Sequence, residues 1–304
     1  MSNISPIDGR YKKNVSELGE YFSEQALMRH RVMVEVKYLL ALVEHKSFKK
    51  TRALSKKTFT SLKNLYVDFS LKDFKQIKKI EEKTNHDVNA VVVFISEKLK
   101  RAGRKDLVPL VHFGLTSEDV NNTAYSLMTR GAVDNIMIPS IKSVLKELKT
   151  LSKKTKSLPL LSLTHGQPAT TTTLGKELAV FISRVERELA LIKKMRLLAK
   201  FSGATGSYAA HKVAFPGFSW SVFSKRFINK LGLEQSPVST QIEPGDSLAE
   251  LFHSFVRINN IFSDFSLDMW LYISRNIFVQ KNIVGEVGSS TMPHKINPIF
   301  FENA

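Results

Sequence analysis

The sequence predicts an all-α protein, because long stretches lack the two strongest helix breakers and carry apolar residues at helical spacing. Neither glycine nor proline occurs in 20–102, 176–202 or 247–284, and such gaps favour long helices. After Gly175, apolar side chains recur every three or four residues, which places them on one face of a helix. The residues of this face are Leu174, Leu178, Phe181, Ile182, Val185, Leu189 and Ile192.

The segment after Asp246 shows the same period. Its predicted apolar face holds Leu248, Leu251, Phe252, Phe255, Ile258, Phe262 and Phe265. If all 38 residues of 247–284 are helical, the helix spans about 57 Å at the usual rise per residue. That length exceeds a compact monomer, so we expect a long-helix bundle shared between subunits.

One segment has strand-like composition but is expected to be helical. Val91–Phe94 lies inside the first breaker-free stretch, between Asn85 as N-cap and a basic last turn at Lys98–Arg101, and both flanking signals favour a helix. Serine, threonine, glycine and proline then gather at 157–173, 202–219, 232–246 and 285–298, where loops are expected.

The helical pattern is interrupted at Gly103–Pro109, which predicts a domain boundary. We expect an N-terminal helical domain at 1–108 and a central long-helix domain at 109–304. Pro298 is expected to be the first residue of a further helix. Its short continuation would leave three adjacent apolar side chains without a partner, so the central domain is expected to be incomplete, with a C-terminal domain absent.

Composition narrows the class of protein. The 304 residues include no cysteine, which excludes disulfides and thiolate metal ligands and fits a cytoplasmic location. No run of 18 apolar residues occurs, so no membrane span is expected. Met1–Arg10 lacks an apolar signal core, and we expect no targeting peptide there.

The formal net charge of +17 leaves two explanations open. It could attract a polyanion or an anionic substrate, or it could reflect a lysine-rich composition on solvated helix faces. The basic residues are spread along the chain without interleaved aromatic residues, which argues against single-stranded nucleic acid as a partner. We therefore expect neither nucleic acid nor membrane partners.

The segment Gly288–Pro298 gives the most specific indication of a functional site. Its glycine and serines allow backbone N–H groups to approach an anion. Lys295 adds a cation, Asn297 adds amide donors, and Pro298 would open a helix whose N-terminus favours negative charge. The alternative is a Gly-Ser linker that ends in a helix cap.

Four other segments hold polar side chains between predicted helices. His165 lies in Thr164–Thr170, where an exposed imidazole can titrate near neutrality, although a lone loop histidine is more often an ordinary surface residue. Asn85–Asp87 is a second candidate, but it is also the predicted start of a helix. Thr116 and Ser117 precede an acidic turn and resemble a capping box, but a helix start can also hold a carboxylate. Thr240–Asp246 forms a turn before the last long helix.

Several motifs are missing from the sequence. It holds no H-E-x-x-H, Walker, G-x-G-x-x-G or G-x-S-x-G pattern, and the spacing of histidine and acidic residues predicts no metal site. The classes of protein that these absent motifs leave open are an acid–base enzyme and a binding protein.

These segments together resemble a known family. Gly288–Pro298 is similar to the fumarase/aspartase superfamily signature G-S-S-x-M-P-x-K-x-N-P. The remaining segments resemble, in order, the bacterial branch of the adenylosuccinate lyases. They are Ser5–Tyr11, Thr84–Asp87, Thr116–Asp119, Thr164–Thr170 and Thr240–Pro244.

The resemblance implies a homotetramer with long helices in a shared bundle, active sites built from three subunits, and no cofactor. It implies small-molecule substrates, namely adenylosuccinate, which would be split into AMP and fumarate, and SAICAR, which would be split into AICAR and fumarate. Another lyase of the superfamily, such as argininosuccinate lyase, is the alternative, and a basic scaffold or nucleic-acid-binding protein without activity is a more distant one.

The resemblance also assigns roles. Ser289 would be the base, chosen over Ser290 by motif position alone. Lys295 and Asn297 would hold the succinyl carboxylate, His165 would protonate the leaving nitrogen, and Glu302 would orient His165. The phosphate end would be bound by Arg10, Tyr11 and His86. The nucleotide or succinyl group would be held by Asn85, Asp87, Thr116, Ser117, Thr164, Gln241 and Met292. Gly245 departs from the branch, which often has histidine there.

Overall fold

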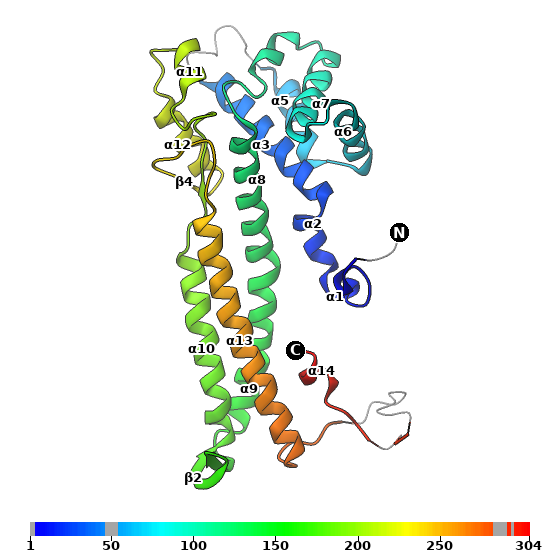
Figure 1. Cartoon of the computed structure of the whole chain (residues 1–304), viewed down its shortest axis with the longest axis vertical. Helices are drawn as coiled ribbons and strands as arrows, with labels where there is room; N and C mark the ends of the chain where they lie inside the picture. The colour runs from blue at the N-terminus through cyan, green and yellow to red at the C-terminus, as the bar shows by residue number, and fades with distance from the viewer. Residues whose placement is uncertain (1–3, 46–53, 282–290, 293–294) are drawn as a thin grey trace. The chain divides into compact units, whose positions relative to one another are not determined.

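Figure 1 shows the computed structural model of the chain, which describes residues 4–45, 54–281, 291–292 and 295–304. The chain divides into two compact units. The first comprises Met1–Pro139 and Arg196–Leu248, and the second comprises Ser140–Met195 and Ala249–Ala304. Helices dominate both units, so the all-α fold class is confirmed. Among the described residues, no helix is both long and apolar enough to cross a membrane.

The first unit is built around α3 (Glu24–Glu44), which contacts five other helices of the described residues. The consecutive residues Tyr38, Leu39 and Leu40 are all buried. Successive helical residues point about 100° apart, so α3 is covered on every side, as expected for a central core helix. Its neighbours are α2 (Gly19–Phe22), α5 (Lys56–Val67), α6 (Leu71–Thr84), α7 (Asp87–Arg101) and α8 (Ser117–Ala132).

Polar capping residues divide the breaker-free stretch of 20–102 into separate helices. Ser70 and Asp73 form a capping box at the start of α6. Asn85 was expected to be an N-cap, and this was wrong: with φ 49° and ψ 35° it ends α6 as the C-cap, a position that asparagine tolerates in the left-handed region. His86 is the N-cap of α7 instead. The helical assignment of Val91–Phe94 is confirmed within α7.

The sequence does not predict one long helical stretch, because Gly131 and Pro139 lie within it. α8, the π-helical segment η4 (Val133–Met137) and α9 (Ile138–Lys154) follow one another without a break. Pro139 has no N–H to donate, and a π-bulge beside it accommodates the lost hydrogen bond. Gly131 is needed for packing, because a Cβ there would lie 2.3 Å from the Tyr21 ring.

In the second unit, charged contacts join the long helices. Lys149 of α9 pairs with Glu186 of α10 (Leu174–Lys194) at 2.6 Å. Arg257 of α13 (Asp246–Ser274) donates to Glu188 of α10 at 2.8 Å. All seven residues of the expected apolar face of α10 are buried, which confirms that prediction.

The expectation for α13 was only partly right. The helix has 29 residues, so it is shorter than the breaker-free stretch of 247–284. Phe252 was placed on its buried face but is 47% exposed, whereas Ile261 is buried.

The loop expected at 157–173 contains an antiparallel hairpin. Strand β1 (Pro159–Thr164) pairs with β2 (Gln167–Thr173), and the register shifts between Leu161 and Leu163. The β-branched threonines of β2 suit a strand, a signal that the many turn-forming residues obscured. A second sheet, of two-residue parallel strands, joins β3 (Leu198–Ala199) to β4 (Glu234–Gln235).

Shorter helices complete the described chain. They are η1 (Pro6–Asp8), α1 (Lys12–Val15), η2 (Ser16–Leu18), α2 (Gly19–Phe22), η3 (Lys105–Leu110), α11 (Ala209–Ala214), α12 (Trp220–Lys230) and α14 (Ile299–Glu302). η3 lies where the sequence predicts a domain boundary, and that boundary stays a prediction. Pro298 precedes α14 as its N-cap, one residue earlier than expected.

An aromatic cluster in the first unit encloses His211, which is 2% exposed. Its ring lies 4.6 Å from the ring of Trp220. The Tyr38 hydroxyl donates to the Phe113 carbonyl at 2.8 Å, so the 3.2 Å contact between His211 Nε2 and Tyr38 Oη requires a proton on Nε2. Burial lowers the pKa of His211 to about 4, and the imidazole is therefore neutral at physiological pH.

This neutral histidine predicts a loss of stability in acid. In the unfolded chain its pKa returns to about 6.5, so between pH 6.5 and pH 4 only the unfolded state binds the proton. The free energy of unfolding should fall by roughly 3 kcal/mol over that interval from this group. Urea denaturation across the interval, compared with His211→Gln, measures the contribution. Equal pH dependence in the two proteins would contradict the prediction.

Candidate functional site

The start of α8 carries two of the expected binding residues. Thr116 is the N-cap, and its N–H donates to Asp119 Oδ2 at 2.8 Å. The capping box expected from the sequence is thus confirmed. Thr116 and Ser117 are half-buried, so both remain accessible to a small ligand.

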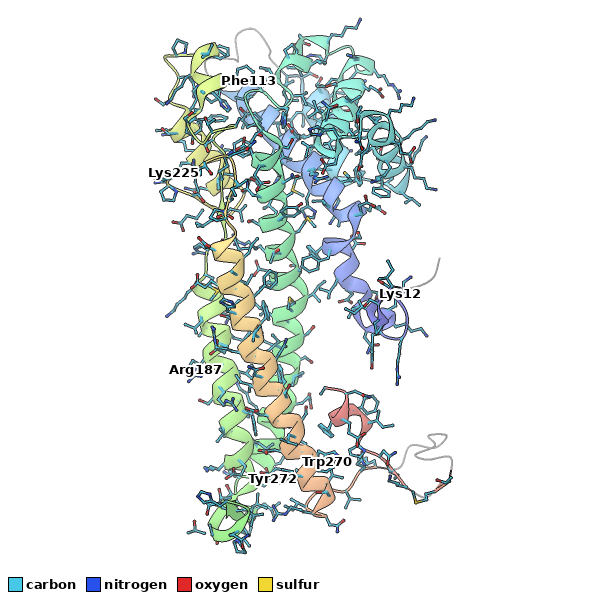
Figure 2. All side chains as sticks on the ribbon, in the orientation of Figure 1. Lys12, Phe113, Arg187, Lys225, Trp270 and Tyr272 are labelled. Carbon is cyan, nitrogen blue, oxygen red and sulfur yellow. The ribbon has the colours of Figure 1, made fainter. Side chains whose placement is uncertain are left out.

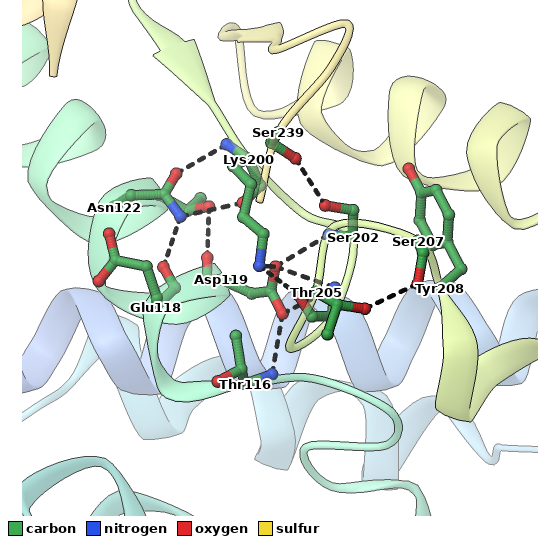
Figure 3. Close-up of polar contacts among 12 residues, drawn as sticks. Thr116, Glu118, Asp119, Asn122, Lys200, Ser202, Thr205, Ser207, Tyr208 and Ser239 are labelled. Atoms are coloured by element: carbon green, nitrogen blue, oxygen red, sulfur yellow. Dashed lines mark hydrogen bonds and ion pairs between the residues drawn. The ribbon is translucent and has the colours of Figure 1, made fainter. Parts of the chain in front are cut away.

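Asp119 lies behind this helix start and is fully buried (Figure 3). Its carboxylate accepts the N–H groups of Ser202, at 2.9 Å, and of Gly203, at 3.1 Å. Lys200 is also fully buried, and its Nζ lies 2.8 Å from Asp119 Oδ1. A buried charge is tolerated only when it is paired and hydrogen-bonded, and this arrangement satisfies both conditions.

Asn122, one turn further along α8, fixes the backbone of Lys200 on both sides (Figure 3). Its Oδ1 accepts the Lys200 N–H at 2.8 Å, and its Nδ2 donates to the Lys200 carbonyl at 3.0 Å. The side chain and the backbone of Lys200 are therefore both tied to α8.

The segment that carries Gln241 lies against the same helix start. Ser202 and Ser239 share a hydrogen bond of 2.9 Å between their hydroxyls, and the Glu118 carboxylate accepts the backbone N–H of Glu243. Burial raises the pKa of Glu118, and it also raises the pKa of Glu243. The structure thus brings Thr116–Asp119 and Thr240–Asp246 together, with the Gln241 side chain exposed.

Arg31 of α3 ties the start of α7 to α8. It is 3% exposed; its Nη2 lies 2.6 Å from Asp87 Oδ2, and its Nε donates to Asn121 Oδ1 at 2.9 Å. Burial alone would raise the pKa of Asp87, but the charge and hydrogen bond of Arg31 help to hold it below its ordinary value. Asp87 is therefore a fixed carboxylate, and the neighbouring His86 and Asn85 are exposed.

The first expected phosphate-binding residues lie near the N-terminus. The Ser5 hydroxyl accepts the Ile7 N–H and caps η1. Arg10 and Tyr11 follow, both exposed, with Arg10 Cζ 5.7 Å from the centre of the Tyr11 ring. The guanidinium is thus available to an external anion.

His165 occupies the tip of the β1–β2 hairpin. Thr164 pairs with Gln167, which leaves His165 and Gly166 as a two-residue turn with φ values of 53° and 72°. Positive φ at both positions is the signature of a type I′ turn. The sequence placed His165 in a turn before a helix; the turn instead closes a hairpin, which precedes α10, and it presents Thr164 and His165 to solvent.

Only part of the signature segment is described. Ser289 and Ser290 lie outside the described residues. The N–H of Lys295 donates to the Met292 carbonyl at 3.0 Å; both side chains are exposed, and Asn297 is half-buried. Glu302 accepts a hydrogen bond at 3.3 Å from the indole N–H of Trp270, which lies near the end of α13 (Figure 2).

The expected site residues therefore divide between the two units. The first unit holds Arg10, Tyr11, Asn85, His86, Asp87, Thr116, Ser117 and Gln241, and the second holds Thr164, His165, Met292, Lys295, Asn297 and Glu302. Within the first unit, buried contacts connect α7, α8 and the Gln241 segment.

Sequence reasoning missed the buried charges that make these connections. Besides Arg31 and Lys200, the fully buried Glu35 accepts the backbone N–H of His112 at 3.1 Å and lies 2.5 Å from its Nδ1. Burial lowers the pKa of His112, but Glu35 outweighs this effect and the pKa is raised. Single charges inside apolar runs, such as Lys200 between Ala199 and Phe201, were the available signal.

At Gly245 there is space for a larger side chain, but the backbone conformation favours glycine. No atom lies within 4 Å of the position a Cβ would take, yet φ is +84°, a conformation that costs energy for other residues. Among the described residues, no three histidine, cysteine or acidic side chains are grouped as a metal site would require.

Comparison with known proteins assigns the family. The model of the family described as "Lyase" matches residues 9–304. The adenylosuccinate lyase of Dictyostelium discoideum is 46% identical over all of this chain, and that of Escherichia coli K12 is 44% identical. The chain spans 67% of the length of each. The chain belongs to the adenylosuccinate lyase family.

This result confirms the adenylosuccinate lyase family predicted from the motifs. A solved structure supports the fold: the 3-carboxy-cis,cis-muconate lactonizing enzyme from Pseudomonas putida has a TM-score of 0.72 and 21% identity. The match covers 94% of this chain and 62% of that enzyme. The two proteins thus share the same fold despite their low sequence identity.

The Arg31 contacts predict a specific cost for a conservative substitution. Arg31→Lys retains the charge, but one ammonium cannot bond Asp87 and Asn121 as the guanidinium fork does. We expect the free energy of unfolding to fall by roughly 2 kcal/mol. Arg29→Lys is the matched control. Its 3.5 Å ion pair with Glu20 and its 2.7 Å hydrogen bond to the Glu20 carbonyl are more exposed, so a change within about 0.5 kcal/mol is expected. Equal losses in urea denaturation would contradict the role assigned to Arg31.

Proposed function

We propose that the chain carries out carbon–nitrogen bond cleavage by β-elimination, releasing fumarate from adenylosuccinate to give AMP and from SAICAR to give AICAR. The match of this whole chain to 67% of the length of adenylosuccinate lyases, at 46% and 44% identity, carries the proposal. Two features of the chain support it: an imidazole at an exposed hairpin tip, and a cation and an amide two residues apart in the signature segment.

In the proposed reaction, Ser289 removes the proton from the succinyl carbon next to a carboxylate. Negative charge then spreads onto that carboxylate, where Lys295 and the Asn297 amide stabilise it. The carbon–nitrogen bond breaks with its electrons going to nitrogen, and His165 donates the proton that the nitrogen needs. No step requires a metal ion or an organic cofactor.

The nucleotide end is assigned to the first unit. Arg10, Tyr11 and His86 bind the phosphate, and the connected residues Asn85, Asp87, Thr116, Ser117 and Gln241 hold the nucleotide or the succinyl group together with Thr164 and Met292. Two observations support this division: the exposed Arg10 side chain, and the network that fixes α7, α8 and the Gln241 segment.

A shared active site is part of the proposal. His165 and Lys295 are exposed, whereas a serine base and a charged transition state need a site from which water is excluded. Another subunit can supply the missing cover, as in a homotetramer whose sites combine residues of several chains, with Glu302 orienting His165. We place this assembly in the cytoplasm.

The proposed activity is tested directly by mixing the protein with adenylosuccinate. We expect adenylosuccinate to be converted to AMP and fumarate, followed by absorbance, with argininosuccinate inert under the same conditions. An enzyme that cleaves argininosuccinate and leaves adenylosuccinate intact would overturn the proposal.

The shared site predicts complementation between inactive variants. His165→Ala and Ser289→Ala should each lower kcat by roughly 10²-fold or more, because each removes one proton-transfer group. After the two variants are unfolded and refolded together, some sites combine an intact His165 with an intact Ser289, and part of the activity should return. Each variant refolded alone is the control. No recovery in mixed oligomers would contradict sites built from several subunits.

A further inference from the structure

We propose that Asp119 and Lys200 are positioning residues for the substrate-binding surface of the first unit. Their buried ion pair would set the Thr116–Ser117 helix start against the segment that carries Gln241. This inference rests on the proposed function, because it concerns how that substrate is held. Neither side chain is accessible to substrate, since both are fully buried.

The carboxylate of Asp119 is surrounded by donors from two parts of the chain. The Thr116 N–H comes from the start of its own helix, and the Ser202 and Gly203 N–H groups come from the turn after β3. Lys200 adds the ammonium group, which also donates to the Gly203 carbonyl. An ionised carboxylate accepts all of these contacts at once, and no neutral side chain of similar size can do so.

The same turn reaches the Gln241 segment. The Ser202 side chain bonds Ser239 at 2.9 Å, two residues before Gln241. Gly206 approaches so closely that a Cβ there would lie 1.9 Å from the Ser239 carbonyl oxygen. Any displacement of the turn relative to α8 is therefore transmitted to Ser239, and the distance between Ser117 and Gln241 changes with it.

The ion pair is better explained by geometry than by stability. A buried pair gains little over apolar residues of the same volume, because the attraction must first offset the desolvation of both charges. Its directional contacts instead fix one arrangement of two loops, and groups that bind a substrate must be held to within about 0.5 Å.

The first experiment compares two aspartates in the same structural role. Both oxygens of Asp119 face N–H donors, and Asp119→Asn replaces one of these two acceptors with an amide NH₂ while removing the charge. Asp73→Asn is the matched control, because Asp73 is also the third helical residue, which completes a capping box, and also pairs with a lysine, Lys98, at 3.0 Å. At temperatures where both remain folded, Asp119→Asn should raise KM for adenylosuccinate and Kd for AMP roughly tenfold. The Asp73 variant should stay within about twofold of the parent.

A second experiment separates positioning from mere stabilisation. If Asp119 acts through Ser117, then Ser117→Ala should raise KM less in the Asp119→Asn background than in the parent, because the hydroxyl is already displaced. Factors that multiply independently would overturn the proposal, as would a folded Asp119→Asn protein with the KM and AMP affinity of the parent.

A milder variant covers the case in which Asp119→Asn fails to fold. Ser202→Ala removes only the hydroxyl bond to Ser239, and a KM increase of roughly threefold is expected, with a melting temperature lower by only a few degrees. Ser55→Ala is its control, since Ser55 and Thr58 also share a 2.9 Å hydroxyl contact, but at the start of α5. Equal KM values in these two variants would overturn the proposal. A parent enzyme that does not act on adenylosuccinate would instead refute the proposed function.

Discussion

The enclosed carboxylate of Asp119 joins two parts of the first unit that lie far apart in the sequence. A charge without water must find all its partners in the protein, and here three N–H groups and one ammonium converge on it. This requirement fixes where α8 begins and where the turn after β3 lies. The Gln241 segment follows, because Ser239 is bonded to that turn.

Arg31 extends the same principle to the other side of α8. Its guanidinium joins Asp87 to Asn121, so α8 is tied to the start of α7 as well as to the turn after β3. The expected nucleotide-binding residues lie on helix starts and loops, which are intrinsically more variable than helix interiors. Buried charges placed behind them supply the rigidity that loop backbone lacks.

The sequence predicted what depends on local pattern and missed what depends on tertiary contact. The apolar face of α10 and the capping box at Thr116 follow from spacing alone, and both are present. The sequence predicts a loop in place of the hairpin that carries His165, because this segment has many turn-forming residues besides its β-branched threonines. Asn85 was misassigned because asparagine suits both helix ends. The pairing of Asp119 with Lys200 joins residues 81 positions apart, and no local pattern encodes such a contact.

The exposed position of the chemical groups is itself informative. In water the charge of Lys295 is screened, and the imidazole at the hairpin tip is likewise surrounded by solvent, so neither could stabilise a charged transition state alone. The same groups become effective once a surface excludes solvent and lowers the local dielectric. Under the proposed function, the fold separates two tasks: the first unit would fix a binding surface through buried charge, and the second would present reactive side chains that function only when covered. A site assembled from several chains satisfies both requirements, because assembly supplies the cover without burying the reactive groups in the unassembled chain.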